Sequence, residues 1–136
     1  MDAQQIAIAR DCLDGAYANT LSFPESVRRL MEAGFESYFV DYRRNTRTHY
    51  LPSGESLVLD NPHEEAAVAA DFDAASIAAA IKWAQSGAAD YNYADFNRRA
   101  TASGCAGYFV SFCGRRVVYH GRTGDQHVEW FPGAAR

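Results

Sequence analysis

The sequence repeats itself at an offset of 70 residues, and this self-similarity limits what the chain can fold into more than any other feature does. The aligned pairs are Arg28-Arg29 with Arg98-Arg99, Gly34 with Gly104, Tyr38-Phe39-Val40 with Tyr108-Phe109-Val110, and Gly54-Glu55 with Gly124-Asp125. So many matches at one constant offset are hard to produce by accident. They indicate an internal duplication of a unit about seventy residues long.

Each copy begins with two stretches of helical character. A first helix is expected over about residues 3–18 and again over 73–86, where apolar residues recur at helical spacing. In the first copy, residues 22–25 combine an N-cap serine, a proline in the first turn and a glutamate three positions after the serine. Gly34 and Gly104 are expected to end the second helices, because glycine readily takes a positive φ.

The pattern then changes to segments rich in aromatic and β-branched residues, which predict strands. The expected strands are residues 36–42, 46–51, 55–59, 106–113, 116–121 and 125–131. Each copy is therefore an α-α-β-β-β unit. Three strands and two helices make a thin core, so we expect the copies, about 1–62 and 71–132, to pack as one α+β domain. Its strands would be antiparallel, with the copies related by a pseudo-twofold axis and joined by a polar and Ala-rich linker.

Composition narrows the classes of partner. The net charge of -4 gives no overall attraction to nucleic acid or to anionic lipid. No apolar stretch approaches the roughly 18 residues of a membrane span, and the N-terminus lacks the features of an export signal. The three cysteines have no C-x-x-C spacing, so reduced thiols in a cytoplasmic protein are expected.

Several residues follow the order and spacing of a known family. They are Gln85-Ser86-Gly87-Ala88-Ala89-Asp90-Tyr91, Phe96, Ala102-Ser103-Gly104, Tyr108-Phe109-Val110, and Val118-Tyr119-His120 before Gly124. Over nearly its whole length the chain resembles the YbcV-like family of small bacterial and prophage-encoded proteins. The family pattern has a cysteine where Asn97 stands and a tryptophan where Tyr108 stands. The resemblance implies no activity, because the family has none assigned and the label "phage envelope protein" on some members carries no mechanism.

The last hairpin carries a candidate metal site. We expect a two-residue turn at Thr123-Gly124, which sets His120 opposite His127. Glu129 would share their solvent-side face, while Val128 would lie on the apolar face toward the core. Two imidazoles and a carboxylate could hold a divalent metal in a metal-binding protein or metal-assisted enzyme. The alternative is two exposed histidines that are merely cross-strand neighbours.

Paired arginines are a second candidate. Twelve of the 13 basic residues are arginine, and the pairs Arg28-Arg29 and Arg98-Arg99 recur at the repeat offset. Because a guanidinium suits bidentate recognition of anions, these four side chains could line a groove between the copies for a phosphorylated or carboxylate metabolite. The alternative is that they are solvated surface charges.

The remaining signals favour a binding module over an enzyme. No Walker loop, G-x-S-x-G, G-x-G-x-x-G or paired-carboxylate pattern is present, and no cofactor is expected. The aromatic residues of the strands are Tyr38, Phe39, Tyr42, Tyr108, Phe109 and Phe112. One alternating set should be core, and the surplus on the other face could be a stacking platform for a flat ligand or, more simply, a dimer interface. We therefore predict a non-catalytic cytoplasmic interaction module that forms a homodimer.

Overall fold

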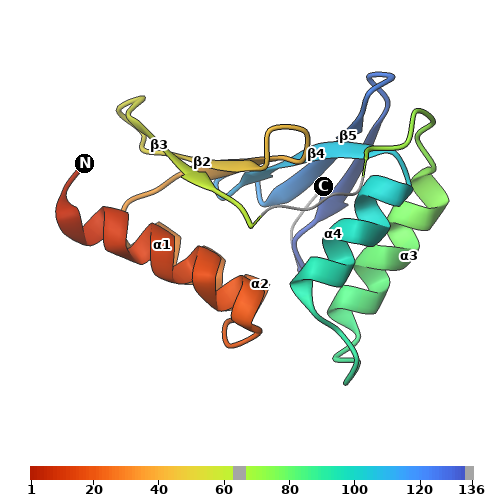
Figure 1. Ribbon diagram of the computed structural model, residues 1–136. Helices are drawn as coiled ribbons and strands as arrows, with labels where there is room; N and C mark the ends of the chain where they lie inside the picture. Colours follow the sequence, from red (N-terminus) through yellow and green to blue (C-terminus); the bar gives the residue numbers. More distant parts are fainter. Residues whose placement is uncertain (63–66, 134–136) are drawn as a thin grey trace.

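The chain runs through two successive sets of two helices and three strands (Figure 1). The computed structural model describes residues 1–62 and 67–133. The helices are α1 (Ala3–Ala18), α2 (Phe23–Glu32), α3 (Ala74–Gln85) and α4 (Tyr93–Ala102). The strands are β1 (Ser37–Asp41), β2 (Thr46–Tyr50), β3 (Ser56–Asp60), β4 (Cys105–Ser111), β5 (Arg116–Gly121) and β6 (Gln126–Trp130). The α+β class is confirmed, and each element falls close to its predicted range.

The same order of elements recurs at the predicted offset. Helices α2 and α4 begin 70 residues apart, at Phe23 and Tyr93, and strands β2 and β5 begin at Thr46 and Arg116. The recurrence agrees with the predicted pair of units, while their origin by duplication stays a prediction. Residues 63–66 of the predicted linker lie outside the described residues.

The helix ends follow from local sequence. Asp2 and Gln5 form a capping box at the start of α1, in which each side chain accepts the backbone N–H of the other residue at 2.7 and 3.0 Å. Gly34 and Gly104 follow α2 and α4 with φ of +104° and +90°, as predicted. Within the described residues, no helix has both the length and the apolar character that crossing a membrane requires.

The strands form one antiparallel sheet in the order β3-β2-β1-β4-β5-β6. At its centre, Phe39 of β1 lies directly opposite Phe109 of β4. Tyr38 pairs with Val110, and Val40 pairs with Tyr108. Because Phe39 and Phe109 are equivalent positions at the 70-residue offset, the two halves meet across an approximate twofold axis at this pair.

The two faces of the sheet differ in what covers them. The helical hairpins α1–α2 and α3–α4 both lie on one face, which we call the helix face (Figure 1). Alternate residues that point to it, such as Tyr38 and Val40, are 2% and 0% exposed. The other face, which we call the open face, carries the residues between them. Val58 and Phe109 there are 57% and 37% exposed.

The cysteines are unpaired. Cys12 and Cys105 are buried in the core, whereas Cys113 is exposed after the end of β4. Burial raises the pKa of the Cys105 thiol to about 11 and also raises the pKa of the Cys12 thiol. The two buried thiols are therefore protonated and unreactive at neutral pH.

Candidate functional site

The turn of the β5–β6 hairpin is longer than we predicted. The N–H of Gly121 donates to the carbonyl of Asp125 at 2.9 Å, and the N–H of Gly124 donates to the carbonyl of Gly121 at 3.1 Å. Gly124 has a φ of +86°. This is a three-residue loop, a type I turn followed by a left-handed residue, and not the two-residue turn that the sequence suggested.

The longer loop shifts the strand register by one residue. His120 lies opposite Gln126, and His127 lies opposite Tyr119, so the predicted pairing of the two histidines is wrong. A one-residue shift moves every side chain of a strand to the other face. His120 therefore lies on the open face, whereas His127 and Glu129 lie on the helix face. These three residues do not converge on one ion, and no group of three or more His, Cys, Asp or Glu side chains in the described part of the chain could hold a metal.

Each histidine of the last hairpin has its own contacts. The ring of His120 stacks on Phe39 with the ring centroids 5.6 Å apart. Burial and the neighbouring charge of Arg43 lower the pKa of His120. On the helix face, His127 Nε2 lies 3.3 Å from Glu129 Oε2. Both histidines therefore take part in packing or local pairing on separate sides of the sheet.

The first arginine pair lies on the outer surface of α2. Arg28 Nη1 is 3.5 Å from Glu32 Oε1, an exposed contact between successive turns of the helix. Arg29 lines a shallow groove between α1 and α2 that Asp2, Asp11 and Glu32 also line. Three carboxylates beside one guanidinium make this groove unfavourable for an anion.

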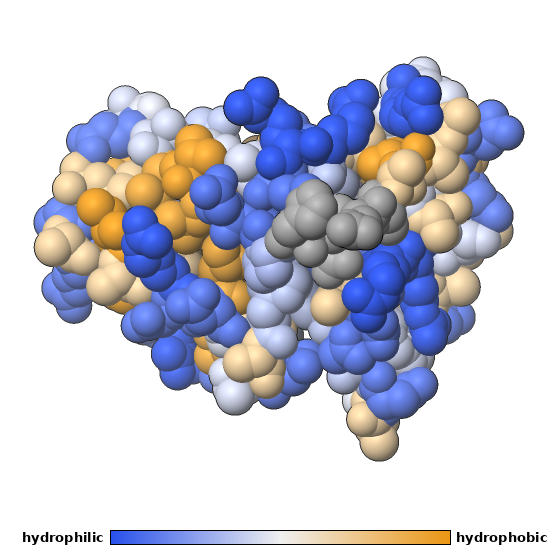
Figure 2. All heavy atoms as spheres, viewed as in Figure 1, coloured by the Kyte–Doolittle hydropathy of each residue, from blue (hydrophilic) through white to orange (hydrophobic). Residues whose placement is uncertain are grey.

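The second arginine pair is engaged on its own hairpin. Arg98 forms an ion pair with Asp95, and the guanidinium carbon of Arg99 lies 3.7 Å from the centroid of the Trp83 ring. Hydrophilic residues dominate the surface over α4, where this pair lies (Figure 2). The two arginine pairs belong to different helical hairpins and have separate contacts, so an anion groove shared between them stays a prediction.

The open face carries a continuous row of six residues, one from each strand. In the order of the sheet they are Val58, Thr48, Phe39, Phe109, Val118 and Val128, each directly opposite the next. Five of the six are apolar, and nothing in the described chain covers them. We call this set the open-face row. Exposed apolar side chains that are contiguous across a whole sheet mark an interaction surface.

Strand β6 makes the apolar character of the open face most evident. Its polar residues His127 and Glu129 point to the helix face, while Val128 and Trp130 point to the open face. In a sheet with one solvated face, the apolar residues of a strand face the core and the polar ones face solvent, and β6 has the opposite arrangement. Val128 is 39% exposed.

Charged groups border the open-face row on both sides. Asp41 and Asp60 lie on one side of it, in the same cross-strand row as His120. On the other side, the guanidinium carbon of Arg116 lies 4.0 Å from the centroid of the Trp130 ring. The open face is therefore apolar along its middle and polar along its margins, the arrangement typical of protein interfaces.

A second unusual region is buried on the helix face, around Arg47 of β2. Arg47 is 2% exposed and lies between the aliphatic residues Val40 and Leu59 in the sheet. Its Nη2 donates to the hydroxyl of Tyr93 at 2.8 Å, and its guanidinium carbon lies 4.6 Å from the centroid of the Tyr38 ring. Its Nε has no hydrogen-bond partner. No Asp or Glu of the described residues forms an ion pair with it.

His49 lies two residues further along β2 and is fully buried. Its ring packs between Phe35 and Tyr38, with both centroid distances 5.6 Å. The backbone of Leu57 is its nearest polar neighbour, and neither ring nitrogen makes a well-formed hydrogen bond. Burial, and then the charge of Arg47, lower the pKa of His49 to about 3, so its imidazole is neutral at physiological pH.

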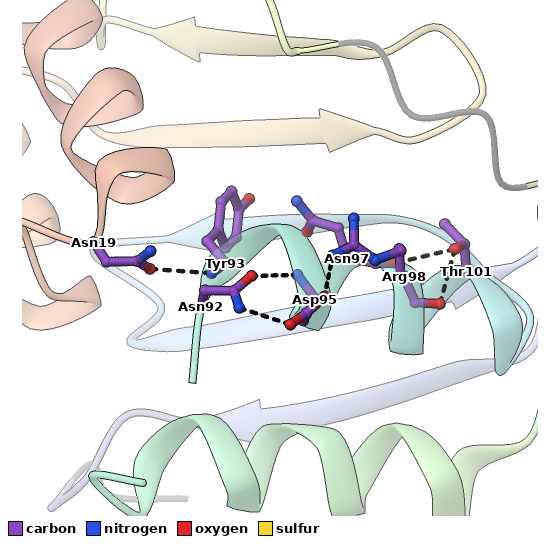
Figure 3. Close-up of polar contacts among 7 residues, drawn as sticks. All are labelled: Asn19, Asn92, Tyr93, Asp95, Asn97, Arg98 and Thr101. Atoms are coloured by element: carbon purple, nitrogen blue, oxygen red, sulfur yellow. Dashed lines mark hydrogen bonds and ion pairs between the residues drawn. The ribbon is translucent and has the colours of Figure 1, made fainter. Parts of the chain in front are cut away.

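Hydroxyl and amide groups lie on the Tyr93 side of Arg47. Tyr93 and Asn97 are one turn apart on α4, and their side chains point to the same side of the helix (Figure 3). The hydroxyl of Tyr93 bonds that of Tyr108, while Asn97 accepts from the hydroxyl of Tyr42 at 2.7 Å and donates to that of Tyr17 at 3.0 Å. We call Arg47, His49 and these five side chains the Arg47 cluster.

No motif in the sequence points to the Arg47 cluster, because its members come from different elements and are spread along the chain. One available signal was the comparison of the two halves. At the 70-residue offset, Arg47 corresponds to Val117 and His49 corresponds to Tyr119. The second half thus fills the equivalent places without a positive charge.

The cluster has the chemistry of an anion-binding site more than of a catalytic one. It combines one permanent cation with hydroxyl and amide donors, and the described residues add no carboxylate that could serve as a general base. Comparisons with known proteins do not narrow this further, because no model of a protein family and no curated protein matches the chain.

Proposed function

We propose that this protein is a non-catalytic interaction module that forms a homodimer through the open face of its sheet. The observation that carries the proposal is the open-face row, which crosses all six strands from Val58 to Val128 with Thr48 as its one polar residue. Burying this row against a second sheet removes apolar side chains from water, at about 25 cal/mol for each Å². The free chain would otherwise keep Val58, Phe109 and Val128 in contact with solvent.

The approximate twofold symmetry makes a second copy a suitable partner. In a symmetric dimer the same patch occurs on both subunits and must complement itself. The order of residue types in the open-face row is similar from either end, since Phe39 and Phe109 lie at its centre and a valine lies at each end. With the two sheets face to face and β1 of one copy over β4 of the other, the phenylalanines of the two copies pack together.

The margins of the open face complement one another in this arrangement. Turning one sheet about an axis parallel to its strands brings His120 of one copy toward the strands that carry Asp41 and Asp60 in the other. Tyr50 of one copy likewise approaches Arg116 of the other. Opposite partial charges at the rim set the alignment of the two sheets more than they add affinity.

Analytical ultracentrifugation of the wild-type protein and of Phe109→Asp tests the proposal. The wild type should sediment at about twice the chain mass of 15.0 kDa, and Phe109→Asp at the chain mass, because a carboxylate at the centre of the interface would be buried without a partner. Val58→Asp, on the edge strand β3, should weaken the dimer with less risk to the fold.

Met31→Asp is the matched control. Met31 is 52% exposed on α2, on the other side of the sheet, so the same change of charge should leave the dimer intact. Circular dichroism verifies that each variant is folded. A wild type that remains monomeric at millimolar concentration, or a Phe109→Asp variant that remains dimeric, would show that the open face does not mediate self-association.

A cytoplasmic location and membership of the YbcV-like family are further parts of this proposal. The unpaired state of Cys12, Cys105 and Cys113 supports the first, because a reducing compartment keeps thiols free. The order of aromatic and glycine residues along the chain supports the second. Mass spectrometry of thiols alkylated in intact cells tests the redox state directly, and a disulfide involving Cys113 would contradict it.

A further inference from the structure

Arg47 has no charged counterpart in the other half of the fold, which makes its presence informative. The equivalent position in the other half holds Val117, also buried and also flanked by strands on both sides. The helix face of this sheet therefore accepts an aliphatic side chain at such a place. A buried guanidinium without an anion is costly by comparison, because its charge has lost water and gained only neutral partners.

The neutral partners of Arg47 do not satisfy it. The hydroxyl of Tyr93 accepts one hydrogen bond, and the rings of Tyr38 and Tyr93 lie 4.6 and 5.6 Å from the guanidinium carbon. The Nε of Arg47 and Oδ1 of Asn61 are buried without a partner, and the imidazole of His49 has only the backbone of Leu57 beside it as a polar neighbour. These three side chains belong to β2 or to the residue that follows β3.

We propose that the Arg47 cluster is a binding site for a small carboxylate, with the guanidinium of Arg47 as its cationic anchor. A single guanidinium balances a single negative charge, and its planar fork matches the two oxygens of a carboxylate. The Tyr93 and Tyr108 hydroxyls bond each other, so one proton of the pair serves that bond, and the Tyr108 hydroxyl is free to donate to a ligand once Tyr93 moves away. The flat, aromatic surroundings suit a planar group, and no acidic side chain of the described residues competes for the cation.

Entry to the site requires the two helical hairpins to separate, since Arg47 is 2% exposed. The hairpins meet where Asn19, at the end of α1, accepts the backbone N–H of Tyr93, the first residue of α4, at 3.2 Å (Figure 3). Tyr93 thus holds the guanidinium and also stands at the junction. Opening this junction moves the hydroxyl of Tyr93 away from Arg47 and leaves the cation free for a carboxylate.

Thermal unfolding in sodium acetate and in sodium chloride of equal ionic strength tests the site. Acetate at a hundredfold excess over its Kd should raise the midpoint by roughly 10 °C above that in chloride. Arg47→Met should abolish this shift. In sodium chloride, the unfolding midpoint of this variant should equal or exceed that of the wild type. Arg116→Met, which removes an arginine from the open face, should keep the full shift.

Near-UV circular dichroism of the wild type gives a readout that needs no variant. Acetate should change the tyrosine signal saturably, because the carboxylate binds among buried tyrosines. The proposal is overturned if acetate and chloride give the same midpoint and spectrum, or if Arg47→Met retains the shift. A shift that depends on Arg47 but appears with sodium phosphate and not with acetate would overturn the carboxylate assignment. This result is independent of the dimer, which ultracentrifugation reports separately.

Discussion

Burial of His49 makes the stability of the protein depend on pH over a defined range. The pKa of His49 is about 3 in the folded protein, whereas an unfolded chain has the ordinary value of about 6.5. As pH falls below about 6.5, the unfolded state binds a proton at His49 and the folded state does not. Acid therefore favours unfolding until the pH approaches 3, and above about pH 7 the residue has no effect.

The size of the effect follows from the difference in pKa. At pH 5, which is about 1.5 units below the unfolded pKa, protonation of the unfolded chain lowers the free energy of unfolding by about 2 kcal/mol, at roughly 1.36 kcal/mol for each unit. Substitution by phenylalanine should remove this dependence. The equivalent position of the other half holds the larger ring of Tyr119, also buried.

Urea denaturation of the wild type and of His49→Phe at pH 7 and pH 5 measures the effect. Between the two pH values the wild type should lose about 2 kcal/mol more of its free energy of unfolding than the variant does. His120→Phe is the matched control. The pKa of His120 is lowered in the same direction, but its ring is partly exposed on the open face, so its contribution should be smaller. Parallel losses in the wild type and His49→Phe would show that His49 is protonated normally and that it is not buried as described.

Two further predictions concern the backbone and the thiols. Gly104→Ala should lower the free energy of unfolding in urea by more than about 3 kcal/mol, because its φ is +90° and a Cβ would lie 2.0 Å from the carbonyl oxygen of Asp71. Gly124→Ala, which has open space around it, should lower the free energy of unfolding by about 1 kcal/mol. Equal losses in the two variants would contradict the close contact at Gly104. In the native protein, a thiol reagent such as dithionitrobenzoate should modify Cys113 rapidly and Cys12 and Cys105 only on unfolding, and rapid reaction of more than one thiol would contradict their burial.

Much of the fold could be predicted because the signals for it are local and occur twice. The Asp2–Gln5 capping box and the glycines after α2 and α4 each act within a few residues, so the sequence is enough to identify them. The pairing of strands between the two halves depends on contacts that are not local, since it joins residues about 70 positions apart. The repeat predicted only that the two copies pack together around a pseudo-twofold axis, and it did not identify β1 and β4 as the strands that pair.

The register of the last hairpin could not be predicted because its two signals agreed on the same wrong register. Thr123-Gly124 resembles a two-residue turn, and apolar Val128 and Trp130 suggested a core-facing set. The assumption that apolar residues of β6 must face the core led to the wrong register. In the first half, Leu57, Val58 and Leu59 are all apolar, so the equivalent strand could not correct the error.

The two candidate regions differ in how their residues compare between the halves, and this difference separates their roles. The open-face row has phenylalanine at both central positions and valine at both ends, so its two halves differ only at Thr48 and Val118. A surface with that symmetry suits a partner that meets both halves in the same way, and a second copy of the chain does so. The Arg47 cluster has no such counterpart, because Val117 and Tyr119 replace its charged and imidazole groups. A site confined to one half binds once per chain, as a small ligand would. Self-association and ligand binding would then use opposite faces of one sheet, and an Arg47→Met variant that remains dimeric would separate them.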